Sequence, residues 1–309
     1  LFTPRQLLMI LTIVKYVRSS YDEMLEAGVE EGRAQAILAY LALVVDKMAL
    51  RSNTLCTWAT TSSWGRLTQA FSRQALEMVW DYAEANPFSE ASGSFLLALK
   101  DTAIHARILR SLDNPAEVTR GSATFLPYED QLFDAIVTDP PYYDNIFYAD
   151  LSDFFFVWIK RSLGYTFSAH FSAYLSPKKK EVVASPWRQS DRNEAKEFYE
   201  QSLMASLIQA YRVLKPGAPL VVVYAHKTTA GWATLVDAMR FAGFTVTEAW
   251  PLDTELTGHL KADIAALASS IFLVARRREV DGTGSYEREV RPDLQRIVRE
   301  RVERLWAQG

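Results

Sequence analysis

The sequence predicts an α/β fold that follows an N-terminal helical region, and two observations carry this prediction. Up to about residue 114, apolar residues recur at helical spacing, whereas beyond it short β-rich segments alternate with helical ones. Two of the β-rich segments, 220–224 and 271–275, are continuously apolar, as is typical of central strands in a sheet covered on both faces. We therefore expect a helical region (1–114), an α/β core (115–280), and a linker with a charged helix (281–309).

The helical region is predicted from capping signals and apolar periodicity. Thr3-Pro4 is a capping residue followed by proline at the first helical position. Gly28 and Gly32 interrupt the apolar pattern, and Asn86-Pro87 stops a later helical run. The polar residues 52–65 are expected to form a loop. After the first helix, we expect helices over residues 33–50, 67–85 and 93–112.

The α/β core is predicted from four β-rich segments that helical segments separate. The turn Lys215-Pro216-Gly217 precedes one strand, and Asp139-Pro140-Pro141 ends another. Strands are expected over residues 133–138, 220–224, 245–250 and 271–275. Helices are expected over residues 193–214, 231–242 and 290–306.

Composition excludes several classes of protein. Of the 309 residues, 49% are hydrophobic, which excludes a disordered chain. The single cysteine, Cys56, excludes a disulfide framework and a cysteine-rich zinc site in this chain, and it fits a reducing, cytoplasmic setting. A net charge of −3 excludes a uniformly basic surface but leaves room for a local basic groove. We expect no signal peptide and no membrane span.

The segment with the clearest chemistry is Asp139-Pro140-Pro141-Tyr142, directly after a predicted strand. Ligands of open α/β sheets bind beyond the carboxyl ends of the strands. Two prolines make the turn rigid and remove two N–H donors, so we expect its carbonyls to be unpartnered acceptors beside the Asp139 carboxylate. Acceptors next to the Tyr142 ring suit a planar group that bears an amine, such as an extruded nucleobase.

This motif resembles the Asp-Pro-Pro-Tyr motif of S-adenosylmethionine-dependent amino methyltransferases, above all the adenine-N6 DNA methylases. The wider stretch 134–153 (DAIVTDPPYYDNIFYADLSD) is similar to the family of adenine-specific DNA methylases that contain a zinc ribbon. The resemblance covers nearly the whole chain. Further similar segments are 1–8, 73–87, 224–229, 250–255 and 266–274.

The resemblance implies a Rossmann-like methyltransferase sheet, S-adenosyl-L-methionine as cofactor and DNA as partner. It implies that the Asp139 carboxylate and the Pro140 carbonyl accept hydrogen bonds from the target amine, that Pro141 completes the catalytic turn, and that Tyr142 stacks on the base. It also implies that Gly121-Ser122-Ala123, together with Asp139, contacts the cofactor, although Ser122 stands where many members have Asp. For Gly121-Ser122-Ala123, a simple turn entering a strand is the alternative.

The chain departs from the family in one respect. None of its 13 glycines forms the glycine-rich turn that approaches the methionine moiety of the cofactor. Family members carry that turn and the zinc ribbon upstream of the position of Leu1. We therefore expect an internal fragment or one half of a split enzyme, with a sheet that lacks its first strands and an upstream fragment or partner chain that supplies the turn.

Five other residues are candidates for substrate binding. Tyr143 and Asn145 are expected to line the base pocket. Lys178 and Lys179 lie in a basic loop that suits DNA phosphates, with a solvated loop as the alternative. His226 follows a predicted strand at the carboxyl edge of the sheet. The remaining histidines are scattered singly, so we predict no metal site.

Three alternative functions stay open. The first is methylation of another planar amine: cytosine N4, an RNA base or a glutamine side chain. The second is a non-catalytic DNA-binding half of a split methyltransferase. The third is a plain nucleotide-binding module in which the Pro-Pro turn is only structural.

Overall fold

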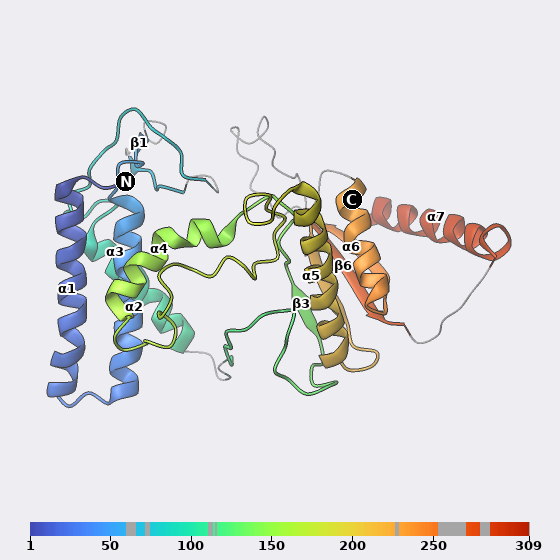
Figure 1. Ribbon diagram of the computed structural model, residues 1–309, viewed down its shortest axis with the longest axis horizontal. Coiled ribbons are helices and arrows are strands. Elements are labelled where there is room, and N and C mark those ends of the chain that lie inside the picture. The colour runs from blue at the N-terminus through green and yellow to red at the C-terminus, as the bar shows by residue number, and fades with distance from the viewer. Residues whose placement is uncertain are drawn as a thin grey trace. The chain divides into compact units, whose positions relative to one another are not determined.

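The computed structural model describes residues 1–59, 66–71, 75–110, 114, 116–225, 229–252, 270–278 and 285–308. The chain divides into two compact units (Figure 1). Unit 1 comprises Leu1–Ser122 and Pro141–Tyr199, and unit 2 comprises Ala123–Pro140 and Glu200–Gly309. The sequence predicts three consecutive regions, 1–114, 115–280 and 281–309. In the structure, residues 141–199 instead belong to unit 1, together with the N-terminal helices.

Unit 1 is helical, and its first two helices form an antiparallel pair (Figure 1). Thr3 and Gln6 form a capping box at the start of α1, and the Glu30 carboxylate accepts hydrogen bonds from the first turn of α2. The apolar faces of α1, α2 and α4 share one core, in which Leu38 packs with residues such as Val14 and Trp158. The helices are α1 (Pro4–Glu26), α2 (Glu31–Arg51), α3 (Phe95–Arg110) and α4 (Tyr148–Leu163).

The helix predicted over residues 67–85 is wrong. Its first residue, Leu67, ends the short strand β2 (Arg66–Leu67), which pairs antiparallel with β1 (Trp58–Ala59), and residues 75–85 are irregular. The periodic apolar residues of this segment do not form a buried face, because Met78 is 89% exposed and Trp80 96% exposed. Without burial of one face, helical periodicity does not stabilise a helix.

Unit 2 contains a four-stranded mixed sheet with the strand order β3-β4-β6-β5. β3 (Ile136–Thr138) pairs parallel with β4 (Leu220–Tyr224), and β6 (Ser270–Arg277) runs antiparallel to both β4 and β5 (Phe244–Leu252). Strands β3, β4 and β5 are therefore parallel to one another. Helix α5 (Arg192–Val213) precedes β4, and α6 (Thr229–Phe241) connects β4 to β5. This alternation confirms the predicted α/β class.

Burial shows that one face of the sheet is covered within unit 2. Leu220, Val222 and Tyr224 of β4 are fully buried, and the Tyr224 ring meets Trp232 of α6 edge to face. On the opposite face, Val221 and Val223 of β4 are partly buried, and Val137 of the edge strand β3 is 70% exposed. The predicted central strands 220–224 and 271–275 contain no exposed residue.

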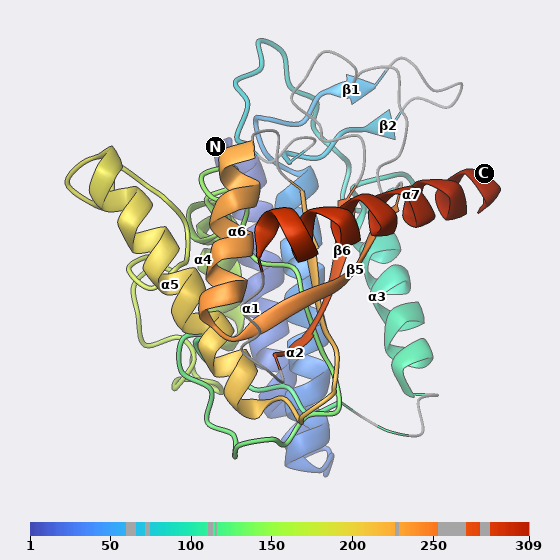
Figure 2. The same cartoon turned by 90° about the vertical axis from the view of Figure 1, so that its right-hand side faces the viewer.

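The C-terminal helix contacts the edge strand β5 through two of its side chains. A π-helical turn, η1 (Tyr286–Val290), leads into α7 (Arg291–Gln308), which passes in front of β5 and β6 in the view of Figure 2. Arg301 forms an ion pair with Glu248 of β5 at 2.5 Å, and Arg304 lies over the Trp250 ring. No helix in the described part of the chain is long and apolar enough to span a membrane.

Candidate active site

The candidate motif begins where β3 ends. Because β3, β4 and β5 are parallel, their carboxyl ends lie at one edge of the sheet, where ligands of α/β sheets bind. Asp139 follows β3 directly and is exposed, and Pro140 is half-buried. The division between the two units falls between Pro140 and Pro141, so Asp139 and Pro140 belong to unit 2, and Pro141 and Tyr142 to unit 1.

The two proline carbonyls differ in their hydrogen bonding. The Pro141 carbonyl accepts a hydrogen bond from the Tyr199 hydroxyl at 2.8 Å and one from the Tyr143 amide at 3.2 Å. The expectation that both carbonyls are unpartnered is therefore wrong for Pro141. Among the described residues no donor reaches the Pro140 carbonyl, which is the one that the resemblance assigns to the target amine.

Tyr143 holds an uncommon backbone conformation next to the motif. Its φ of 56° is in the left-handed region, which costs a non-glycine residue about 1–2 kcal/mol. The surroundings hold it there, because its carbonyl accepts a hydrogen bond from the Ala184 amide at 2.9 Å. Its ring also meets the buried Tyr199 ring edge to face at 5.2 Å. Tyr199 thus supports both Pro141 and Tyr143, a role that sequence reasoning missed.

The rest of the turn is compact and faces solvent. The Asn145 amide donates to the Tyr142 carbonyl at 3.0 Å, which closes the turn that carries both residues. Tyr142 is half-buried and the Asn145 side chain is exposed. Both side chains therefore lie at the surface of unit 1, beside the clamped Pro141.

The predicted cofactor segment lies at another division between the units. Gly121 and Ser122 end the first part of unit 1, and Ala123 begins unit 2. Residues 122–125 form a tight turn. A Cβ atom added to Gly121 would meet no atom within 4 Å, so its surroundings leave space beside the backbone.

Lys178 is part of an ion-pair network rather than a free cation. Its Nζ donates to the Asp153 carboxylate at 2.6 Å, and Ser176 donates to the same carboxylate. Burial alone would raise the pKa of Asp153, but the hydrogen bonds from Lys178 and Ser176 outweigh it and hold that pKa below its usual value. A DNA phosphate would have to compete with this carboxylate for Lys178. The neighbouring Lys179 is exposed.

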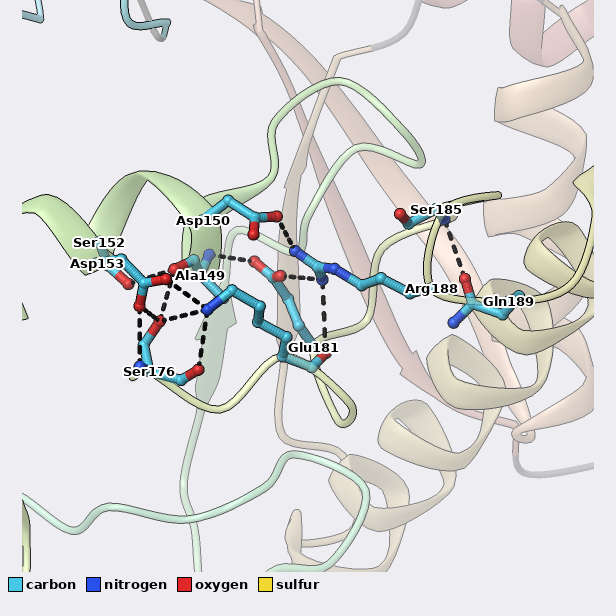
Figure 3. A network of polar contacts seen from close by, with 10 residues as sticks. Ala149, Asp150, Ser152, Asp153, Ser176, Glu181, Ser185, Arg188 and Gln189 are labelled. Atoms are coloured by element: carbon cyan, nitrogen blue, oxygen red, sulfur yellow. Dashed lines mark hydrogen bonds and ion pairs between the residues drawn. The ribbon is translucent and has the colours of Figure 1, made fainter. Parts of the chain in front are cut away.

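A second ion pair in this network supports the start of α4. Arg188 donates to both Asp150 and Glu181 (Figure 3). Burial would lower the pKa of the Arg188 guanidinium, but the hydrogen bonds to these two carboxylates raise it above its usual value. Glu181 also accepts the Ala149 amide at 2.9 Å, in the first turn of α4, where the N-cap residue Phe147 offers no side-chain bond. A remote carboxylate thus caps this helix.

The remaining candidates give no further site. His226 lies outside the described residues. Within the described ranges, no group of three or more His, Cys, Asp or Glu side chains could hold a metal ion. Of the predicted site residues, backbone hydrogen bonds link Pro141–Tyr143 and Asn145 within one turn of unit 1.

Comparisons with known proteins give distant matches only. No family model and no curated protein matches the chain. Three solved structures of TTHA0409 from Thermus thermophilus, described as a "putative DNA modification methylase", are similar to it at 14–16% identity. The alignment with the selenomethionine derivative includes 54% of this chain, with a TM-score of 0.29. The alignment with a second form includes 54% of this chain, with a TM-score of 0.31. The alignment with the complex with S-adenosyl-L-methionine includes 52% of this chain, with a TM-score of 0.29.

The chain spans about half the length of these structures, with 54–56% of each covered. TM-scores this low do not define a shared fold. The proposal below therefore depends on the residues of this chain alone.

Proposed function

We propose that this chain is part of a methyltransferase that transfers a methyl group from S-adenosyl-L-methionine to an exocyclic amino group of DNA, with adenine N6 as the target. The observation that carries the proposal is the sequence Asp139-Pro140-Pro141-Tyr142 directly after the parallel strand β3, with an exposed carboxylate at its head. This is the edge of an α/β sheet at which ligands bind.

The chemistry assigned to these residues is positioning of the amine. The Asp139 carboxylate and the Pro140 carbonyl accept the two N–H groups of the amine, which directs the nitrogen lone pair out of the plane of the base. Tyr142 stacks on the base, a contact worth about 1–3 kcal/mol. Tyr199 holds the following carbonyl, that of Pro141, so the turn is fixed before the substrate arrives.

The cofactor supplies an electrophilic methyl group on a sulfonium sulfur when it is bound. The residues that would contact it are Ser122, through its hydroxyl, the backbone at Gly121 and Ala123, and Asp139. The open space beside Gly121 is in keeping with such an approach.

The decisive experiment compares two carboxylate substitutions in unit 2. Asp139→Ala should lower methyl transfer to DNA by on the order of 10²-fold or more, because the amine loses a charged acceptor. Glu129→Ala removes another exposed carboxylate from unit 2 and should leave the rate unchanged. The measurement is transfer of a labelled methyl group from the cofactor to DNA by the whole protein. Full activity of the Asp139 variant would refute the assignment.

Mass analysis of the methylated product, as nucleosides for nucleic acid and as peptides for protein, identifies the acceptor. We expect N6-methyladenine, whereas N4-methylcytosine, a methylated RNA base or methylglutamine would move the activity to one of the alternative acceptors. Calorimetric titration of S-adenosyl-L-methionine, with and without an upstream fragment, tests the split-enzyme hypothesis. Binding that requires the fragment would support a chain that depends on a partner for the cofactor.

A further inference from the structure

Unit 1 contains a cationic cavity that the proposed function does not use. It has a volume of about 520 Å³ and lies between α1 and the end of α4 with the segment that follows. Its lining includes the cations Arg18, Lys160 and Arg161 and the rings of Tyr165, Phe171 and Tyr174.

A second cavity, of about 450 Å³, extends this cationic surface along α1. It shares Arg18 and Arg161 with the first cavity and adds Lys15. Lys15 and Arg18 are three residues apart on a helix and therefore project from the same face. We call Lys15, Arg18, Lys160 and Arg161 the basic cluster.

The basic cluster is held by neutral groups. The Arg18 guanidinium lies over the Tyr165 ring at 4.2 Å. Lys160 donates to the Ala173 carbonyl, and Arg161 donates to the Val157 carbonyl at 3.3 Å. Within the described part of the chain, none of the four cations forms an ion pair, and no described lining residue of either cavity is a carboxylate.

Two other basic residues of unit 1, Lys178 and Arg188, differ from the basic cluster in having carboxylate partners. Lys178 and Arg188, near the candidate motif, are paired with Asp153 and with Asp150 and Glu181. The basic cluster instead keeps several like charges around one hollow, and their mutual repulsion is unfavourable until an anion enters. Such an arrangement is typical of a site for an anionic ligand.

The aromatic rings narrow the class of ligand. Tyr174 is 89% exposed beside the cations, so its ring is free to stack on a flat group. Alternating cations and exposed rings bind nucleic-acid strands, with phosphates on the cations and bases on the rings.

We propose that the basic cluster binds the phosphodiester backbone of DNA, with Arg18, Lys160 and Arg161 around one phosphate, Lys15 at the next, and a base on Tyr174. The choice of DNA as the polymer rests on the proposed function. The cluster would thus hold the substrate on the helical unit, and the Asp139–Tyr142 turn would select the amine.

The test measures DNA binding by the whole chain with a fluorescent oligonucleotide between about 50 and 200 mM salt. The variant Arg18→Gln/Lys160→Gln/Arg161→Gln should weaken binding on the order of tenfold at low salt and lower the salt slope by about 1, since one phosphate contact is lost. The matched control Arg33→Gln/Lys100→Gln/Arg107→Gln removes three exposed cations from other faces of unit 1 and should keep the wild-type slope. Tyr174→Ala should weaken single-stranded DNA on the order of tenfold.

The outcomes separate this inference from the proposed function, because binding is measured without cofactor and without turnover. An unchanged affinity and slope in the basic-cluster variant would overturn the inference, even if the wild type methylates DNA. An equal loss in the control variant would also overturn it, since the effect would then be non-specific. Tighter binding of RNA of the same sequence would overturn the choice of DNA. Loss of methylation in Asp139→Ala with normal DNA binding would leave the inference intact.

Discussion

At the scale of single residues, Asp46 of α2 has an unusual environment. Its side chain is buried in unit 1, beside Val45, and one carboxylate oxygen has no hydrogen-bond partner. Desolvation by burial raises its pKa to about 8. In the folded protein at pH 7 the carboxyl group is therefore mostly protonated, whereas in the unfolded chain it is ionised.

This difference gives a pH-dependent stability with a definite sign. The unfolded chain releases the Asp46 proton near pH 4 and the folded chain near pH 8, so the free energy of unfolding falls as the pH rises between these values. Asparagine has no proton to release in this pH range, so Asp46→Asn removes the decrease in the free energy of unfolding. The variant should be more stable than the wild type by about 1–3 kcal/mol at pH 8 but little at pH 4.5. Urea unfolding at both pH values measures it, with the exposed Asp22→Asn as control. Equal effects at both pH values would contradict the assignment.

Tyr199 gives a second residue-scale prediction. Tyr199→Phe keeps the ring against Tyr143 but removes the hydroxyl that holds the Pro141 carbonyl, which should cost about 1 kcal/mol of stability. If the turn positions the amine, kcat of methyl transfer should fall about tenfold with little change in DNA affinity. Tyr211→Phe is the same substitution on the same helix, and it should leave kcat unchanged. A loss of DNA affinity alone would argue against a positioning role.

At the scale of elements, helix α4 depends on a carboxylate from another segment. Glu181 accepts the Ala149 amide and binds Arg188, so it both caps the helix and neutralises a half-buried cation. This arrangement links the start of α4 to the loop that follows it in the chain.

Glu181→Ala should therefore lower the stability of unit 1 by about 1–3 kcal/mol, since the helix loses a cap and Arg188 loses a partner. Hydrogen exchange of the first turn of α4, together with thermal unfolding, measures it. Glu197→Ala, an exposed carboxylate on α5, should change stability by less than about 0.5 kcal/mol. Unchanged exchange at Leu151 and its neighbours in the Glu181 variant would show that the cap is dispensable.

The elements also show where sequence patterns suffice. The apolar run Leu220–Tyr224 and the periodic segments of α5 and α6 were predicted within a few residues, because one buried face decides both pattern and structure. The segment 67–85 was predicted wrongly, since its apolar residues do not share one buried face: Ala70 is buried, whereas Met78 and Trp80 are exposed.

The candidate site, too, could be predicted from the sequence only in part. The Asp139–Tyr142 motif is local and readable from sequence. The support by Tyr199 lies 58 residues away, and the cap by Glu181 is 32 residues from Ala149, so no local pattern indicates either contact.

At the scale of the whole molecule, each of the two compact units buries apolar residues of its own. Leu38 lies in the core of unit 1, and Leu235 is fully buried in unit 2. Units that bury their own apolar residues can open independently.

Leu38→Ala and Leu235→Ala should each cost about 2–5 kcal/mol, and the loss should be confined to one unit. Hydrogen exchange with mass spectrometry should show faster exchange of α1, α2 and α4 in the first variant and of β4 and β6 in the second. Each variant serves as the control for the other. A uniform acceleration over both units in either variant would show that the molecule unfolds as one cooperative body.

The left-handed backbone of Tyr143 has an evolutionary consequence. Related sequences should tolerate glycine or asparagine at this position, because both residues adopt positive φ readily, although both lack the large aromatic ring. Valine and isoleucine should be absent from this position, because β-branched residues rarely adopt positive φ. Selection at this position would then depend more on the backbone conformation than on the aromatic ring. Saturation mutagenesis at position 143 would measure directly which residues are tolerated.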